Sequence, residues 1–179
     1  ISTGKYFEYK QGMDMRLMTK KKAKLLNQAK YHKDYIFAFD DLDEKEQLIP
    51  KIKLWNKYKS KQTLFYVLTA WKGQDKQNIA NAFERIKILM QLGCLPYVMK
   101  HKKYKNSKWK GIYTTLARWT NQRSFFKKQS FREFCHSTAE HGSDSALRYM
   151  KKFEKENPNI AKKYFDLTFI IAFFIYKVH

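Results

Sequence analysis

The chain has 179 residues, and its 37 Lys and Arg against 16 Asp and Glu give a net charge of +21. Its 6 Gly and 3 Pro are too few for a collagen-like chain, and an apolar fraction of 44% argues against wholesale disorder. Two cysteines exclude a disulfide-rich domain and any four-cysteine zinc or iron–sulfur site built by this chain alone. No signal segment opens the sequence, so we expect a cytoplasmic protein.

Strand-like and helix-like segments alternate through the first hundred residues. In the clearest helix, Ile79, Phe83, Ile86 and Met90 recur at helical spacing, and Gly93 follows as a C-terminal cap. The expected order is strand 6–17, helix 20–31, strand 35–39, helix 42–58, strand 63–69, helix 75–92 and strand 95–99. Pro50 predicts a kink or a late start in the second helix. Strands that begin about every thirty residues indicate βαβ units with parallel strands.

The pattern changes after residue 100. We expect a basic loop over 100–111, a short helix over 111–119, irregular or extended chain over 125–134, a linker over 137–144 and a helix over 145–155 that ends before Pro158. The apolar segment 167–176 is too short for the ~20 residues of a membrane span, so it predicts a strand or a docking segment. The expected division is residues 1–111, an α/β unit, and residues 112–179, a basic and mostly helical extension.

Few motifs of known chemistry are present. The chain has no GxxxxGK[ST], GxGxxG or HExxH motif, and Cys94 and Cys135 stand 41 residues apart without partners at metal-ligand spacing. We therefore expect no metal site in this chain.

The charged pair Asp14 and Arg16 interrupts an otherwise apolar strand candidate. Alternate residues of a strand share a face, so both side chains are expected to point the same way. Two interpretations are open: a mutual ion pair that neutralises itself, or contacts from both residues to a polar ligand. Asp40, at the end of the next strand, either joins that ligand site or caps the following helix.

The excess of positive charge also has two interpretations. It is either a solvated lysine-rich surface or a surface for a polyanion. Residues 100–132 mix cations with aromatic side chains, which suits phosphate contacts and base stacking. The candidate nucleic-acid or substrate residues are Lys102, Lys103, Trp109, Arg118, Trp119, Asn121 and Arg123.

These segments also carry a family resemblance. The succession QGMDMRLMTKKKAKLL, YIFAFDDLDEKEQLI, LFYVLTAW, FERIKILMQLGCLPYVMKH and LARWTNQRSFF resembles the C-terminal half of a radical S-adenosylmethionine (radical SAM) protein of the short, phage- and mobile-element-associated kind. The resemblance covers about residues 6–135. It implies a partial (β/α)₆ barrel of which this chain supplies the later strands, that is, half of a barrel.

The resemblance also implies a cofactor site. The ends of the later strands line the pocket for S-adenosylmethionine in that family. This implies cofactor-binding roles for Gln11, Asp14, Arg16, Asp40 and Thr69. It further places Tyr97 and Met99 on the last strand, with Arg118, Trp119 and Asn121 closing the pocket or meeting the substrate.

One departure from the family limits this implication. The CxxxCxxC loop that holds a [4Fe–4S] cluster is absent from this sequence, so the chain by itself is not expected to perform the family's reductive cleavage. We expect either a piece of a longer enzyme, whose missing N-terminal half of the barrel supplies the cysteines, or a degenerate scaffold. The alternative function is a basic nucleic-acid-binding module without catalytic activity.

Overall fold

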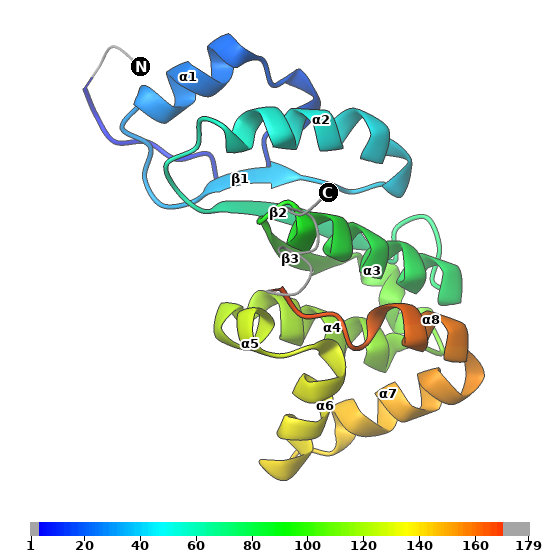
Figure 1. Cartoon of the computed structure of the whole chain (residues 1–179). Coiled ribbons are helices and arrows are strands. Elements are labelled where there is room, and N and C mark those ends of the chain that lie inside the picture. The colour runs from blue at the N-terminus through cyan, green and yellow to red at the C-terminus, as the bar shows by residue number, and fades with distance from the viewer. Residues whose placement is uncertain (1–3, 170–179) are drawn as a thin grey trace.

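A computed structural model describes residues 4–169 and shows an α/β protein built on a parallel sheet (Figure 1). The strands are β1 (Tyr35–Ala38), β2 (Thr63–Thr69) and β3 (Leu95–Lys100), in the order β1-β2-β3. Phe37 lies opposite Phe65, and Tyr66 lies opposite Tyr97. The three strands expected at these positions, and their parallel direction, are confirmed.

The N-terminal segment differs from the strand expected over 6–17. Its strand-like pairing is limited to two isolated parallel bridges, Phe7 with Tyr31 and Met13 with Phe37. After Met13 the chain turns into a 3₁₀ helix, η1 (Met15–Leu17), because the Asp14 carboxylate accepts the Arg16 backbone N–H. Asp14 and Arg16 therefore do not lie on one face of a strand, as the sequence had led us to expect, but at the start of a 3₁₀ helix.

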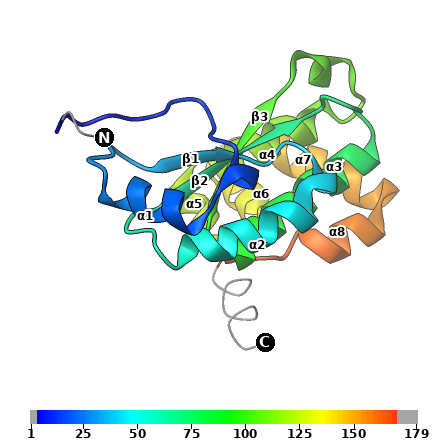
Figure 2. The ribbon, with the colours of Figure 1, turned by 90° about the horizontal axis from the view of Figure 1, so that it is seen from above.

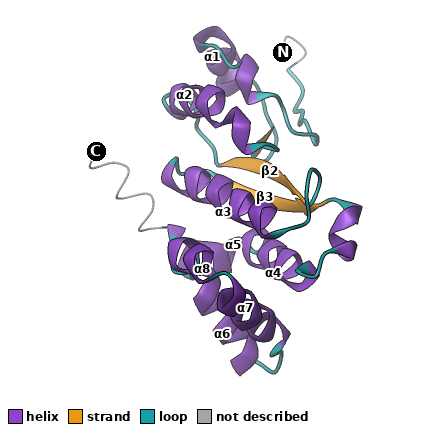
Figure 3. Ribbon diagram, turned by 90° about the vertical axis from the view of Figure 1, so that its right-hand side faces the viewer, coloured by secondary structure: helices purple, strands orange, loops and turns teal. Residues whose placement is uncertain are grey.

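Three helices, one before each strand, lie on one face of the sheet (Figures 2 and 3). They are α1 (Lys20–Gln28), α2 (Lys45–Asn56, preceded by η2, Leu42–Glu44) and α3 (Lys76–Gln91). Pro50 lies inside α2, which begins at Lys45, three residues later than expected. Gly93 follows α3 with φ of +64°, the left-handed conformation that glycine adopts without strain.

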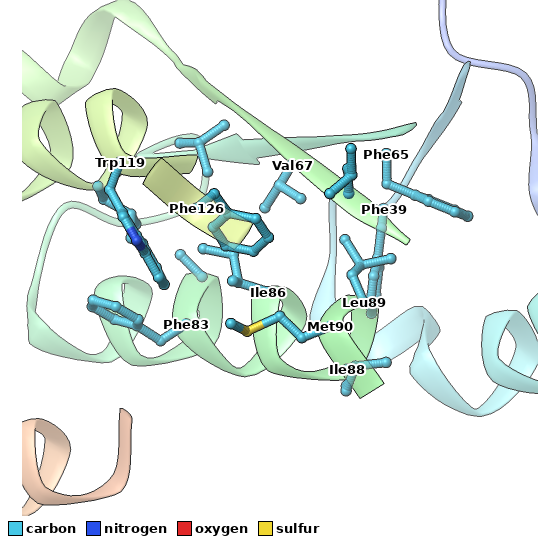
Figure 4. Packing of buried hydrophobic residues seen from close by; sticks show 14 of the residues in the cluster. Phe39, Phe65, Val67, Phe83, Ile86, Ile88, Leu89, Met90, Trp119 and Phe126 are labelled. Atoms are coloured by element: carbon cyan, nitrogen blue, oxygen red, sulfur yellow. The ribbon is translucent and has the colours of Figure 1, made fainter. Parts of the chain in front are cut away.

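The core lies between the sheet and these helices (Figure 4). Alternate strand residues such as Phe65 and Val67 are fully buried and pack toward Ile86 and Leu89 of α3. Trp119 and Phe126 enter the same core from the part of the chain that follows β3. Burial of these aromatic side chains supplies much of the hydrophobic driving force.

Over its described length, the chain beyond β3 forms helices joined by short turns. It comprises η3 (Lys102–Asn106), α4 (Lys110–Asn121), α5 (Arg123–Lys128), α6 (Phe131–Glu140), α7 (Ser145–Glu156) and α8 (Pro158–Tyr164). The irregular chain expected over 125–134 is wrong, because that range forms α5 and the first turn of α6. The linker expected over 137–144 is wrong in its first half, which belongs to α6. Pro158 ends α7 as expected and also begins α8.

The buried apolar residues before and after position 111 form one core. The division of the chain into two units at residue 111 stays a prediction. Within residues 4–169, no helix has the length and apolar character that crossing a membrane requires. Most of the apolar segment 167–176 lies outside the described residues.

Candidate functional site

The carboxyl edge of the sheet gathers polar side chains from several elements. Thr69 ends β2 and Lys100 ends β3, while Asp40 follows β1 by two residues. Asp14 follows the Met13 bridge beside β1. Parallel strands end at a common edge, where α/β proteins usually place their ligands. We therefore take this edge, with the adjoining sheet face, as the candidate site.

A buried arginine holds the edge together. Arg85 of α3 is only 2% exposed, and its Nη1 donates to the carbonyls of Phe39 at 2.9 Å and Asp40 at 2.7 Å. Its Nη2 donates to the Leu68 carbonyl at 3.0 Å. Burial lowers the pKa of Arg85 to about 10, although nearby carboxylates favour its charge. The guanidinium thus joins the ends of β1 and β2 to α3.

Asp14 and Arg16 form the mutual ion pair that the sequence left as one of two interpretations. Arg16 Nε and Nη2 each donate to the Asp14 carboxylate at 2.9 Å, and Nη1 donates to Glu44 at 2.8 Å. The hydrogen bond from the Arg16 side chain lowers the pKa of Asp14. Both side chains remain partly exposed, so the pair is accessible to a polar ligand.

The two aspartates after β1 have local partners. Asp40 Oδ1 accepts the Leu68 backbone N–H at 3.1 Å, which links the chain after β1 to β2 beyond the last β1–β2 residue pair. Asp41 caps η2 and pairs with Lys72, whose ammonium lowers the pKa of that carboxyl. Asp40 therefore bridges the two strand ends instead of capping the following helix.

The end of β2 is tightly bonded. Thr69 is fully buried, and its hydroxyl donates to the Met99 carbonyl at 3.1 Å. Ala70 follows with φ of +58°, and its N–H donates to Asn78 Oδ1 at 2.9 Å. This bond holds Ala70 in a conformation that non-glycine residues rarely adopt. Thr69 thus supports the edge from inside and offers no side chain to solvent.

An aromatic side chain stands exposed beside the same edge. Trp71 is 50% exposed, and its ring contacts the edge of the His101 ring at 5.1 Å between centroids. The Lys103 ammonium lies 5.6 Å from the Trp71 ring centroid. This group presents an aromatic face and a cation to solvent.

The sheet face opposite the helices is largely uncovered. Tyr97 and Met99 of β3 are 41% and 43% exposed, and the Tyr66 ring lies 5.7 Å from the Tyr97 ring. The Tyr66 hydroxyl donates to the Lys10 carbonyl at 2.9 Å, so the N-terminal segment reaches over this face. Parallel sheets are normally covered on both faces, so the exposure of Tyr97 and Met99 is unusual for a strand of such a sheet.

Gln11 stands apart from the other proposed cofactor residues. It precedes Met13 by two residues and therefore lies beside the beginning of β1, not at the carboxyl edge. Its side chain is exposed in a shallow hollow formed by residues 8–13. Asp14, Arg16 and Asp40 gather at the edge, whereas Gln11 and the buried Thr69 do not join them as side chains.

The basic candidates separate into exposed and internal residues. Lys102 and Lys103 are exposed on η3, and Arg118 is partly exposed on α4. Arg123 is exposed and forms an ion pair with Asp34. The other three candidates have structural partners: Trp109 and Trp119 are buried, and the Asn121 side chain bonds both the N–H and the C=O of Val98.

Neither cysteine is disposed to hold a cluster. Cys94 and Cys135 are both fully buried, and burial raises the pKa of Cys94 to about 11 and that of Cys135 to about 12. Within residues 4–169, His, Cys, Asp and Glu side chains do not gather in a group of three that could hold a metal ion. The chain's own residues therefore do not fit a [4Fe–4S] cluster.

Sequence reasoning did not identify Arg85. A signal was present, because Arg85 shares the apolar stripe of α3 with Ala82 and Leu89, where a charge needs buried partners. Those partners are backbone carbonyls, and no motif encodes them.

Comparisons with protein-family models, with curated proteins and with solved structures gave no match. The function of the edge is therefore inferred from its geometry and from the sequence resemblance.

Proposed function

We propose that this chain is the C-terminal part of a radical SAM-like (β/α)-barrel enzyme and contributes cofactor- and substrate-facing strand ends. The observation that carries the proposal is the succession of Met13, β1, β2 and β3 as parallel neighbours in chain order, with α1, α2 and α3 on one face. That arrangement is the repeating unit of a barrel, in which the face without helices lines the interior.

The two edges of the sheet support the same proposal. At the β3 edge, Asn121 Oδ1 accepts the Val98 N–H at 2.8 Å and Nδ2 donates to the Val98 carbonyl at 3.1 Å, so α4 occupies the place of a further strand. The edge at Met13 has only isolated bridges. Further strands would join there, and the proposed partner is the missing N-terminal half of the barrel.

An apolar cavity of about 420 Å³ lies on that same side. Its lining includes Met13, Leu17, Leu25 and Phe37, and Asp14 is also among the lining residues. In a barrel, the helices form an outer ring that packs on the strands, so an added βα unit on this side would place apolar side chains against this part of the sheet. The cavity is thus where an added unit would bury its side chains.

The site fits S-adenosylmethionine in part. Tyr97 provides an exposed aromatic ring for an adenine, and Asp14 and Glu44 provide carboxylates for ribose hydroxyls or an ammonium group. Arg16 would orient both carboxylates and is placed to meet a ligand carboxylate. The chemistry that S-adenosylmethionine supplies in this family is a reductive cleavage at a [4Fe–4S] cluster, whose cysteines a preceding segment would have to provide.

A decisive experiment joins this chain to the segment encoded upstream of Ile1. We expect that segment to encode CxxxCxxC, and the joined protein, reconstituted anaerobically with iron and sulfide, to bind S-adenosylmethionine in calorimetry. Arg16→Gln should weaken that binding about tenfold, because it removes charge-assisted hydrogen bonds. Arg148→Gln is the matched control, since Arg148 also pairs with an aspartate, Asp144, at 3.1 Å but lies on α7.

Two results would overturn the proposal: an upstream segment without the three cysteines, or a folded, cluster-containing protein that does not bind S-adenosylmethionine. The alternative function, a nucleic-acid-binding module, is supported by the exposed Lys102 and Lys103, the second of which lies beside the Trp71 ring. It has less support, because the Trp109 and Trp119 rings expected to stack on bases are buried.

A further inference from the structure

Helices α4 and α7 pack against one another (Figures 1 and 3). A second cavity lies between them and η3, which follows the carboxyl end of β3. Its volume is about 420 Å³, within the usual range of small-molecule sites. Two stretches that are distant in sequence form it. The lining residues are Tyr104, Lys105, Lys110, Gly111, Thr114, Thr115, Arg118, Ser145 and Tyr149.

The lining is positively charged and contains no carboxylate. Lys110, Thr114 and Arg118 follow one another at intervals of four on one face of α4, so the Cα atoms of the two cationic residues lie about 12 Å apart along the helix axis, a span that their long side chains can shorten. Lys105 approaches from η3. Within residues 4–169, these three cations form no ion pair, whereas the neighbouring Lys108 pairs with Glu156 at 2.9 Å.

The cavity also offers hydroxyl donors. Thr114 and Thr115 direct their hydroxyls back to the α4 carbonyls of Lys110 and Gly111. The Tyr104 and Tyr149 hydroxyls, in contrast, make no hydrogen bond to another residue in the described part of the chain. These two groups can therefore donate to a ligand oxygen.

The Tyr149 ring forms an aromatic wall of the cavity and lies very close to the backbone of α4. A Cβ atom at position 111 would lie 2.2 Å from Tyr149 Cγ, so only glycine permits the Tyr149 ring to lie against the first turn of α4. Tyr149 is nevertheless 41% exposed, which leaves part of its ring available. The first turn of α4 also directs the positive end of the helix dipole toward this region.

We propose that this cavity binds a phosphomonoester carried on a flat ring, of the size and chemistry of a nucleoside monophosphate. Lys110, Arg118 and Lys105 neutralise the phosphate, and the tyrosine rings contact the flat ring. None of the five residues assigned to S-adenosylmethionine lines this cavity, so the proposal can be tested separately from the barrel function; Arg118 alone is shared with the candidate substrate residues.

The test is calorimetry on the 179-residue chain with adenosine monophosphate as the probe. Adenosine monophosphate should bind at least tenfold more tightly than adenosine. The double variant Lys110→Gln/Arg118→Gln should weaken its binding at least tenfold. The control Lys20→Gln/Lys21→Gln removes the same charge from two exposed residues of α1, at the other end of the molecule, and should leave the affinity within twofold.

A further variant separates the ring from the phosphate. Tyr149→Ala should weaken the binding of adenosine monophosphate several-fold and leave the affinity for inorganic phosphate unchanged. A twelve-nucleotide single-stranded RNA is titrated in parallel, to distinguish a nucleotide from a nucleic-acid backbone as the source of the phosphate. Equal affinity for adenosine and its monophosphate, equal weakening by both double variants, or binding of the RNA alone would each overturn the proposal.

Discussion

The sheet region, residues 4–100, and the helical region, residues 102–169, differ in how completely their faces and edges are covered by other parts of the chain. The helical region packs both on itself and on the sheet region: Trp109 contacts Phe153, while Phe131 and Phe165 contact Phe83 of α3. The sheet region leaves one face and one edge open. The helical region covers the β3 edge through Asn121, so within residues 4–169 the open sheet edge is the one at Met13.

The largest expected effect is the loss of Arg85, which joins the ends of β1 and β2 to α3. Arg85→Met should lower the free energy of unfolding by about 3–5 kcal/mol, because three carbonyls lose a buried charged donor. Urea unfolding followed by circular dichroism measures the change. Lys76→Met, at the exposed start of the same helix, should cost at most about 0.5 kcal/mol. Similar values for the two variants would mean that the sheet edge does not depend on Arg85.

The sequence predicted the sheet region better than the helical region. The strand at 63–69 and the helix that follows it could be predicted because one apolar period runs through each without interruption. The helices over residues 125–134 were not predicted, because cations and aromatic residues are mixed there without a clear helical period. Ser130 and Glu133 form a capping box, a helix-start signal that could have been recognised. The length of the N-terminal strand was overestimated, because its neighbour β1 has only four residues with which it could pair.

The candidate site could be predicted only as a set of strand ends. The pattern placed Asp14, Arg16 and Asp40 at one edge, since parallel strands end together. It did not determine which groups bond to each other, because Arg85 meets Phe39 across 46 residues of chain. Bonds to backbone carbonyls depend on tertiary packing and leave no spacing rule in the sequence.

A smaller effect is expected where the helical region seals the sheet. Asn121→Leu leaves the Val98 N–H and C=O without their partners, so it should cost about 2 kcal/mol. It should also promote association of the chains, because it frees a strand edge. Urea unfolding and analytical ultracentrifugation measure these two effects. Gln122→Leu adds the same apolar group at the exposed neighbouring position and should change neither; if both variants associate equally, the edge is not what Asn121 protects.

The smallest effect concerns an ion-pair network within the helical region. Arg132 of α6 donates to both carboxylate oxygens of Glu154 at 2.9 and 2.7 Å, and its Nε donates to Asp166 at 2.7 Å. The hydrogen bond from Arg132 lowers the pKa of Glu154 below its usual 4.5. Because these side chains are partly exposed, solvent screening limits the contribution, and Arg132→Gln should cost about 1 kcal/mol at pH 7.

The pH dependence identifies the source of that stability. A carboxyl whose pKa is lower in the folded state stabilises the fold above its unfolded pKa, and this contribution disappears as the pH falls through the folded pKa. The difference in unfolding free energy between the wild type and Arg132→Gln should therefore persist from pH 7 to about 5 and shrink below about 4.5. Arg148→Gln, whose pair with Asp144 is well exposed, should show a smaller difference at pH 7. A difference for Arg132→Gln that stays constant down to pH 3 would show that Arg132 stabilises the helices through its packing on the Phe165 ring and not through the carboxylates.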